Sequence, residues 1–361
     1  MTAPGEAARR KPARRPTIKD IARRAGVSES AVSFALNDRP GVSDDTRARI
    51  RRVADELGWQ ANSAARALSG ERAGCLGLVL ARPARTLGVE SFFLQLVSGI
   101  QEVLSARRTA LLFQVVEDLD TECALYRRWW AERRVDGVLV VDPRTDDPRP
   151  ALLAALGLPA VAIGGPAPEP PEPTAAPPLS TVWADDAAAM ARILDHLHGL
   201  GHRRIVHVAG LPELAHTARR IHSLRTEATR RGLDATQVRS ITTDYSDAEG
   251  AEVTRRLLDA AAPPTAIVYD NDVMAIAGAS VAARRGIPVP GRLSLVAWDD
   301  SPLCRVAHPP LTALVRDTAG FGRLAATELL ALLDGGPPRT TEGELPHLEP
   351  RESTGPAPVC N

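Results

Sequence analysis

The chain has 361 residues, a formal net charge of zero and four cysteines, Cys75, Cys123, Cys304 and Cys360. This length supports two or three domains with sizeable cores, and the cysteines lie too far apart to indicate a disulfide framework or a C-x-x-C zinc site. Charge is uneven: residues 1–70 carry 14 Lys and Arg against 8 Asp and Glu, and the remainder carries 30 against 36. This asymmetry is typical of a basic, nucleic-acid-binding module attached to a neutral or acidic body.

Residues 1–16 are basic and rich in Pro and Ala. They lack the apolar run of a signal peptide, and no apolar run in the chain reaches the 18 or so residues that cross a bilayer. We expect a disordered arm that adds nonspecific affinity for DNA, with a solubilising tail as the alternative. We also expect a cytoplasmic protein without membrane contact.

Residues 17–61 predict three short helices that share one small core. Thr17, Ser28 and Ser43 are suited to cap the three helices, and Gly26 and Gly58 to end the first and third. Apolar residues recur at helical spacing in each piece: Ile18, Ile21, Ala22 and Ala25; Ala31, Val32, Ala35 and Leu36; Ile50, Val53, Ala54 and Leu57. Two short helices joined by a tight turn and supported by a third describe a helix-turn-helix.

Residues 62–72 contain the stretch NSAARALSG, which favours helix by composition but is too short to be stable alone. We expect a hinge that folds only when a partner holds it in place.

Beyond residue 72 the pattern changes to apolar runs that alternate with amphipathic helices, which predicts parallel sheets covered on both faces. The expected strands are 74–81, 109–116, 136–142, 159–164, 203–210, 237–243, 265–270 and 293–299. The proline-rich stretch 164–180 excludes a central strand, and we interpret it as the neighbourhood of a boundary between two α/β subdomains.

The segments PTIKDIARRAGVSESAVSFALNDRPGVSDDTRARI, VDGVLVV, GHRRI, NDVMAIAG and PRESTG make the chain resemble the LacI/GalR family of bacterial transcriptional regulators from about Thr17 to Thr354. The resemblance implies a helix-turn-helix headpiece at 17–61, a hinge helix at 62–72 and a core at 73–354 like periplasmic sugar-binding proteins, followed by a tail at 355–361. The core is expected to have two doubly wound parallel-sheet subdomains, one of 73–164 with 293–316 and one of 165–292 with 317–354. It is expected to dimerise and to assemble further in some members.

The resemblance implies a repressor that binds a pseudo-palindromic operator in double-stranded DNA. The second helix would be the recognition helix, with base contacts from Glu29, Ser30 and Phe34. The alternatives are that Phe34 packs into the headpiece core and that Glu29 only favours the helix N-terminus. Caps or phosphate contacts are expected from Thr17, Ser28, Ser33 and Asn37. In the hinge, Asn62, Ala65 and Leu68 are expected at the DNA, with Leu68 wedged into a base step from the minor groove. The alternative is a passive tether in which Leu68 packs on the core.

The resemblance also implies a small-molecule effector between the subdomains. The residues it assigns there are Phe92, Phe93, Arg220, Tyr245, Asn271, Asp272 and Asp299. Phe92 as a core residue and Asp272 as a helix cap are the alternatives. Gly164 and Gly165 replace an Asp-aromatic pair of purine-binding relatives, so we expect a sugar or a related polar metabolite.

Two other classes of protein fit the sequence less well. The motifs of dinucleotide-binding, P-loop, zinc-protease and serine-hydrolase enzymes are missing, so we expect no enzyme activity and no cofactor. The histidines His196, His198, His202 and His207 are better explained by helix-surface and strand positions than by a metal site. An exported solute-binding protein would not carry a basic three-helix headpiece.

Overall fold

The computed structural model describes residues 16–59, 72–82, 91–165 and 179–358. The chain divides into two compact units, one that ends at Glu71 and one that begins at Arg72. The predicted arm, and the hinge with Asn62, Ala65 and Leu68, lie outside the described residues.

The first unit, which we call the headpiece (residues 16–59), contains three helices: α1 Ile18–Ala25, α2 Glu29–Leu36 and α3 Asp44–Glu56. Thr17 caps α1 and forms a reciprocal capping box with Asp20, and Gly26 ends it with a left-handed backbone, φ 65°. The Ser28 side chain accepts a hydrogen bond from the backbone N–H of Ala31 at 3.1 Å. The predicted apolar stripes form the core, whose fully buried members are Ile21, Val32, Ala35 and Ile50. The three predicted helices are therefore confirmed.

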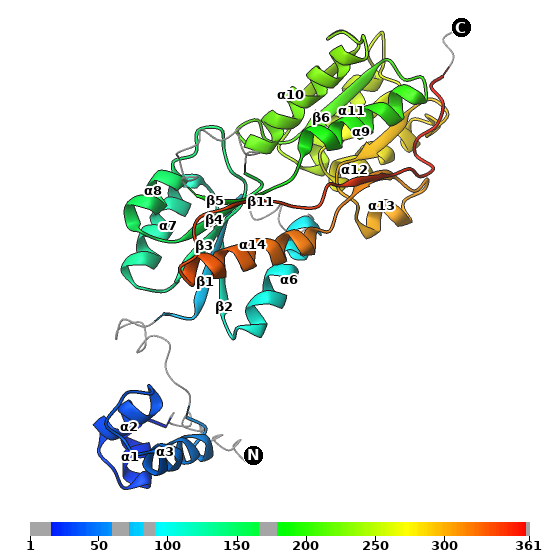
Figure 1. Ribbon diagram of the computed structural model, residues 1–361. Helices are drawn as coiled ribbons and strands as arrows, with labels where there is room; N and C mark the ends of the chain where they lie inside the picture. Colours follow the sequence, from blue (N-terminus) through cyan, green and yellow to red (C-terminus); the bar gives the residue numbers. More distant parts are fainter. Residues whose placement is uncertain (1–15, 60–71, 83–90, 166–178, 359–361) are drawn as a thin grey trace, which may run out of the picture. The chain divides into compact units, whose positions relative to one another are not determined.

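The second unit, the core, contains two six-stranded sheets (Figure 1). In the first sheet all neighbouring strands pair in parallel, in the order β11-β5-β4-β3-β1-β2. Its strands are β1 Cys75–Ala81, β2 Ala110–Val116, β3 Gly137–Val140, β4 Ala160–Ile163, β5 Ser180–Trp183 and β11 Thr340–Glu342. Apolar contacts place α6 Ser91–Ala106 and α14 Thr318–Leu333 on one face. On the other face lie α7 Leu119–Ala131 and α8 Arg149–Leu156.

The second sheet has the order β12-β10-β9-β8-β6-β7, and only its β12 edge is antiparallel. Its strands are β6 Ile205–Ala209, β7 Val238–Thr242, β8 Ala266–Tyr269, β9 Ser294–Ala297, β10 Thr312–Val315 and β12 His347–Glu349. The helices α11 Asp247–Leu258, α12 Asp272–Arg284 and α13 Pro302–Val306 pack on one face. The other face is covered by α9 Asp186–Gly199 and α10 Ala215–Arg230.

All eight predicted strands are present, and the fold class is confirmed. The predicted division of the core into subdomains is wrong. Residues 293–316 contribute β9 and β10 to the second sheet, and 317–354 send α14 and β11 to the first sheet before β12 returns to the second. The stretch 164–180 lies within the first subdomain, since β4 and β5 pair with each other, and the first crossing to the second subdomain follows β5.

The predicted division of the core fails because the chain crosses between the subdomains three times, after β5, β10 and β11. The choice of sheet depends on contacts that are distant in sequence. For example, a Cβ at Gly322 of α14 would lie 2.2 Å from the backbone oxygen of Leu96, and one at Gly99 of α6 would lie 1.8 Å from that of Ala319. These glycines let α14 and α6 approach closely, which fixes α14 on the first subdomain.

Candidate functional site

The exposed face of α2 carries the three residues predicted to contact bases. Glu29 and Ser30 are exposed, and the Ser30 hydroxyl lies 2.9 Å from that of Ser28. Phe34 is 39% exposed and does not belong to the buried headpiece core.

The predicted caps are partly accounted for by the headpiece itself. Thr17 and Ser28 cap α1 and α2, and Asn37 is the C-cap residue of α2. Ser33 is half-buried, and its carbonyl accepts from the Asn37 backbone N–H.

Arg47 is a headpiece residue that the sequence analysis missed. Its guanidinium donates to the carbonyl oxygens of Phe34, Ala35 and Arg39 at 3.3, 3.1 and 2.8 Å. It also pairs with Asp38 at 3.3 Å. Arg47 thus satisfies carbonyls at the C-terminus of α2 and fixes the turn that leaves it. No local pattern marks this role, because the bonds span 8 to 13 residues.

In the core, the carboxyl ends of strands from both sheets meet at a cavity of about 70 Å³. Six of the seven predicted cleft residues line it: Phe92, Phe93, Arg220, Tyr245, Asn271 and Asp299. Asp272 does not line it. Asp272 is buried at the first residue of α12, where burial raises its pKa despite a hydrogen bond from Ser301. Asn271, and not Asp272, is the N-cap of α12 and accepts from the Met274 backbone N–H.

Polar residues that were not predicted complete the cleft: Arg82, Asp142, Asp186, His216, Arg219, Asp270 and Arg316. Several directly follow a strand, as Arg82 follows β1, Asp270 follows β8 and Arg316 follows β10. Ligands bind at the carboxyl ends of strands in open α/β sheets, so for Arg82 and Asp270 the position at or directly after the end of a predicted strand was the signal available in the sequence. Arg316 had no such signal, because β10 was not predicted.

Arg220 is the centre of a buried ionic network in the cleft. It pairs with Asp270 at 3.1 Å and with Asp186 at 3.3 Å, and its guanidinium carbon lies 4.1 Å from the centroid of the Trp298 ring. Burial alone lowers the pKa of Arg220, but the two carboxylates raise it well above its ordinary value. Burial raises the pKa of Asp270, and Arg220 and His207 together overcome that effect and hold it well below its usual range. The Arg220 guanidinium and the Asp270 carboxylate are therefore charged at neutral pH.

Two further ion pairs lie on the other sides of the cleft. Arg82 pairs with Asp142 at 2.7 Å, and Arg316 pairs with Asp299. The Arg316 guanidinium also lies 4.6 Å from the centroid of the Phe92 ring. The described residues that line the cavity thus include four arginines and four aspartates, together with aromatic rings. Such a lining offers many hydrogen-bonding groups without a net charge.

His216 and Tyr245 form a hydrogen-bonded pair at the cleft. The His216 Nε2 lies 2.9 Å from the Tyr245 hydroxyl, which is also 3.3 Å from the Thr217 hydroxyl. Burial and the nearby Arg220 lower the pKa of His216 to about 4, so its ring is neutral at pH 7. Burial and Asp270 raise the pKa of Tyr245 well above 10.

Direct contacts join the two subdomains around the cavity. The Arg219 guanidinium, on α10, donates to the carbonyl oxygen of Gly164, after β4, at 2.9 Å. Arg144 and Leu214 form an isolated antiparallel β-bridge between the loops after β3 and β6. The Ala215 backbone N–H beside it donates to the Pro143 carbonyl at 2.8 Å. These contacts hold the subdomains together on two sides of the cavity.

Three of the four clustered histidines, His196, His202 and His207, form side-chain hydrogen bonds within the core. His202 lies 2.9 Å from the Thr265 hydroxyl, and His207 lies 2.9 Å from the Asp270 carboxylate. Among the residues that the structure describes, no group of three or more His, Cys, Asp and Glu side chains is placed to hold a metal ion. No helix in the described ranges is long and apolar enough to cross a membrane.

Models of known protein families match the sequences of both units. Residues 17–62 match the model of bacterial regulatory proteins of the lacI family, and residues 194–354 match the periplasmic binding protein-like domain. The chain is 31% identical over 332 residues to the HTH-type transcriptional regulator CelR of Thermobifida fusca, which covers 91% of this chain and 94% of CelR. It is also 31% identical over 351 residues to the regulator MalR of Streptomyces coelicolor, covering 94% and 97% of the two chains.

Solved structures of LacI family regulators are also similar to this chain. A LacI family transcriptional regulator from Bifidobacterium animalis subsp. lactis is 37% identical, with a TM-score of 0.70 over 80% of this chain and all of that one. The CelR–cellobiose complex is 30% identical, with a TM-score of 0.69 over 94% of this chain and all of that one. The chain therefore belongs to the LacI family of DNA-binding transcriptional regulators, whose members are not enzymes.

Proposed function

We propose that this regulator is a repressor that binds a pseudo-palindromic operator as a dimer and responds to a sugar or a related polar metabolite in the core cleft. The observation that carries the proposal is the cleft lining, in which four guanidiniums face four carboxylates beside aromatic rings. A neutral polyhydroxylated ligand uses both kinds of group, because each hydroxyl donates one hydrogen bond and accepts others.

Sugar binding is further supported by the aromatic residues of the cleft. Phe92, Phe93 and Tyr245 provide apolar surface for the face of a sugar ring, and the polar side chains set its orientation. The similar protein CelR has been solved with cellobiose. The cavity of about 70 Å³ is much smaller than the several hundred Å³ typical of a ligand pocket. We infer that a ligand enters when the subdomains part, and that the closed and open arrangements differ in DNA affinity.

Operator reading is assigned to Glu29, Ser30 and Phe34 on the exposed face of α2. Glu29 can accept from cytosine N4, Ser30 can bond either kind of base edge, and Phe34 can contact a thymine methyl group. The exposure of Phe34 supports this role over packing in the core. Asn62, Ala65 and Leu68 are proposed to act at the minor groove, with residues 1–16 as a basic arm.

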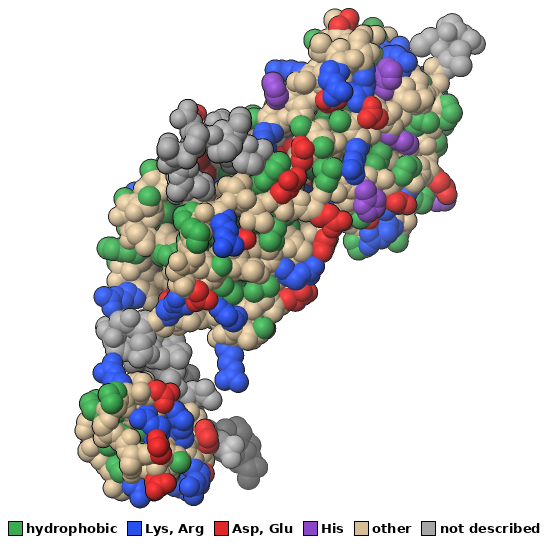
Figure 2. Space-filling model, in the orientation of Figure 1, with side chains coloured by type: hydrophobic (Ala, Val, Ile, Leu, Met, Phe, Trp, Pro, Cys, Tyr) green, Lys and Arg blue, Asp and Glu red, His purple; other side chains and the backbone are tan. Residues whose placement is uncertain are grey.

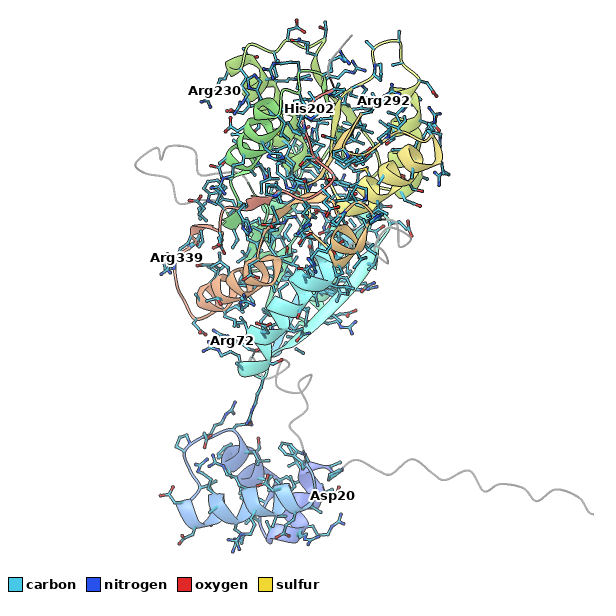
Figure 3. All side chains as sticks on the ribbon, turned by 90° about the vertical axis from the view of Figure 1, so that its right-hand side faces the viewer. Asp20, Arg72, His202, Arg230, Arg292 and Arg339 are labelled. Carbon is cyan, nitrogen blue, oxygen red and sulfur yellow. The ribbon has the colours of Figure 1, made fainter. Side chains whose placement is uncertain are left out.

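Dimer formation is supported by exposed apolar side chains on α6, β2 and α13 of the core. Leu94 on α6 is 74% exposed, and Phe113 on β2 is 41% exposed. Leu303 and Val306 on α13 are 51% and 77% exposed. Figures 1 and 3 both place α13 next to α6. A two-fold dimer through these elements gives two identical recognition helices and hence a symmetric operator.

The test begins with the full-length protein and a pool of random-sequence duplexes. Repeated selection is expected to yield a pseudo-palindrome, and light scattering of the complex is expected to show two protein chains per duplex. A thermal-shift screen of mono- and disaccharides, with purine bases for comparison, then identifies the effector. A ligand at about 100 times its dissociation constant adds about 2.7 kcal/mol of stability. Selection of a single asymmetric half-site, or stabilisation by purines only, would contradict the proposal.

A further inference from the structure

Six arginines lie along one edge of the first sheet. Because all six strands of this sheet are parallel, their amino ends share one edge, and their carboxyl ends face the cleft. Arginines stand just before four of the strands, and all of them are exposed: Arg72, Arg107, Arg108, Arg133, Arg134 and Arg339. We call this set the arginine edge. It lies on the opposite side of the first subdomain from the cleft.

Two arginines of the arginine edge share a single acidic partner. Arg72 and Arg107 share one carboxylate, that of Asp334, at 2.8 and 2.5 Å. Arg134 pairs with Glu132 at 3.6 Å. These side chains stay about half exposed in spite of their partners. Figure 2 shows Lys and Arg side chains along the lower border of the core, below the first sheet.

Two arginines of this edge occupy backbone positions that favour glycine. Arg108 and Arg133 have φ of 51° and 50°, in the left-handed region, in the turns that lead from α6 to β2 and from α7 to β3. Elsewhere in the core, corresponding helix-to-strand turns place glycine in this region: Gly157, Gly201, Gly232, Gly286 and Gly335. A residue with a Cβ costs about 1 kcal/mol more than glycine there. The two positions thus keep an exposed cation where glycine would be less strained.

The arginine edge is also where the chain enters the core from the headpiece. The Asp136 carboxylate accepts from the backbone N–H groups of Ala73 and Gly74 at 2.6 and 2.7 Å, which fixes the start of β1 next to Arg72. The covalent chain between Trp59 and Arg72 can span at most about 45 Å. DNA held by the headpiece is therefore tethered to this edge, whereas Arg230 and Arg292 lie at the opposite end of the core (Figure 3).

We propose that the arginine edge is a second DNA-binding surface, which contacts backbone phosphates of the duplex that the headpiece reads. The inference rests on the proposed operator binding. Guanidinium groups bind phosphate oxygens in two-pronged geometry, and such contacts raise affinity without reading the base sequence. Each contact releases condensed counterions, so its signature is the salt dependence of binding.

The test compares full-length variants on the duplex selected with the wild-type protein. Arg108→Gly/Arg133→Gly removes two cations while relieving two strained turns, so folding is preserved. We expect the slope of log K against log salt concentration to become shallower by about 2, and affinity at 0.1 M salt to fall tenfold or more, with the same preferred sequence. Arg230→Ala/Arg292→Ala removes the same total charge at the opposite end, and we expect the wild-type slope.

A third variant is expected to act in the opposite direction. Asp334→Asn releases Arg72 and Arg107 from their shared carboxylate, so the variant is expected to bind DNA more tightly, with a steeper salt slope. Asp334 is the exposed C-cap residue of α14, where a negative charge is unfavourable to the helix, so the variant stays folded. The inference would be overturned if Arg108→Gly/Arg133→Gly kept the wild-type salt dependence of DNA binding. It would also be overturned if the control Arg230→Ala/Arg292→Ala lost as much DNA affinity. Failure of the wild type to select any duplex would instead overturn the proposed operator binding.

Discussion

The guanidinium carbon of Arg82 lies 4.9 Å from the centroid of the Tyr245 ring, and this contact joins the two subdomains across the cleft. Arg82 follows β1 in the first subdomain, and Tyr245 follows β7 in the second. Tyr245 itself has a left-handed backbone with φ 69°, an uncommon conformation for an aromatic residue. The neighbouring residues must therefore hold Tyr245 in this conformation for its ring to form part of the cleft wall.

Gly210→Ala is expected to displace Tyr245, because a Cβ at Gly210 would lie 1.8 Å from the Cζ atom of the ring. The variant should lose the response of DNA binding to the sugar that most stabilises the wild type, and should keep its affinity for the selected duplex without sugar. Gel-shift titrations with and without sugar measure both quantities.

The matched control is Gly199→Ala, at the last residue of α9, where an added Cβ meets nothing within 4 Å. It is expected to respond to sugar like the wild type. A normal response in Gly210→Ala would show that the position of Tyr245 is not needed for effector binding.

Arg220→Ala is expected to destabilise the core as well as to abolish the effector response. The substitution leaves the buried carboxylates of Asp186 and Asp270 without their shared cation. Removal of one partner from a buried ion pair typically costs about 3 to 5 kcal/mol. Asp299→Ala is expected to cost less, since Asp299 and its partner Arg316 are 16% and 18% exposed. Urea unfolding of the three proteins measures the difference, and equal losses for the two variants would contradict this ranking.

The stability of the core is expected to fall as the pH drops from about 6.5 toward 4. The pKa of His216 is lowered by burial to about 4 in the folded state, so the unfolded chain binds the proton more readily across this window. In His216→Gln, which can still contact the Tyr245 hydroxyl, this part of the pH dependence should disappear.

His196, His198 and His202 also have lowered pKa values, mainly through burial, so the wild type alone does not isolate His216. The informative quantity is the difference in free energy of unfolding between wild type and His216→Gln at pH 4.5 and pH 7. It should change by about 2 kcal/mol between the two pH values. A constant difference would mean that His216 titrates normally.

The headpiece could be predicted from the sequence because its signals are local. Thr17 and Ser28 sit next to the helices that they cap, and the apolar stripes recur within single helices. The eight longer apolar runs of the core were identified for the same reason. The strands β11 and β12 were missed because three residues carry no clear periodicity. The strands β5 and β10 have four residues each, like several strands that were predicted, but the sequence analysis did not identify their apolar stretches as strands.

The assignment of strands to sheets and the full cleft lining could not be predicted, because both depend on non-local pairing. The apolar run of β9 fits either sheet, and its place is fixed by pairing with β8, as Ala266 with Ser294. The family resemblance identified Arg220 and Tyr245 in the cleft, but their partners Asp186 and His216 become apparent only once α9, α10 and β7 are packed together.

A last prediction concerns a buried ionic network outside the cleft. Arg149, at the start of α8, pairs with Glu122 at 3.0 Å and with Asp147 at 2.7 Å. The Tyr126 hydroxyl donates to Glu122 at 2.5 Å. Arg149 also donates to the carbonyl oxygens of Val141 and Asp142 at 2.9 and 2.8 Å. The network therefore clamps the loop that brings Asp142 to the cleft.

Arg149→Met is expected to destabilise the core by about 3 to 5 kcal/mol, because Glu122 is left buried without its cation. Arg149→Met/Glu122→Gln should cost less than the sum of the single variants, since the double variant buries no unpaired glutamate. The same clamp positions Pro143 and Thr145, whose backbones bond to Ala215 and Glu213 across the subdomains. Amide hydrogen exchange at Thr145 and Ala215 should therefore be faster in Arg149→Met than in wild type under native conditions. Unchanged exchange at these two amides, with the expected loss of stability, would show that the network supports the first subdomain without holding the bridge between the two.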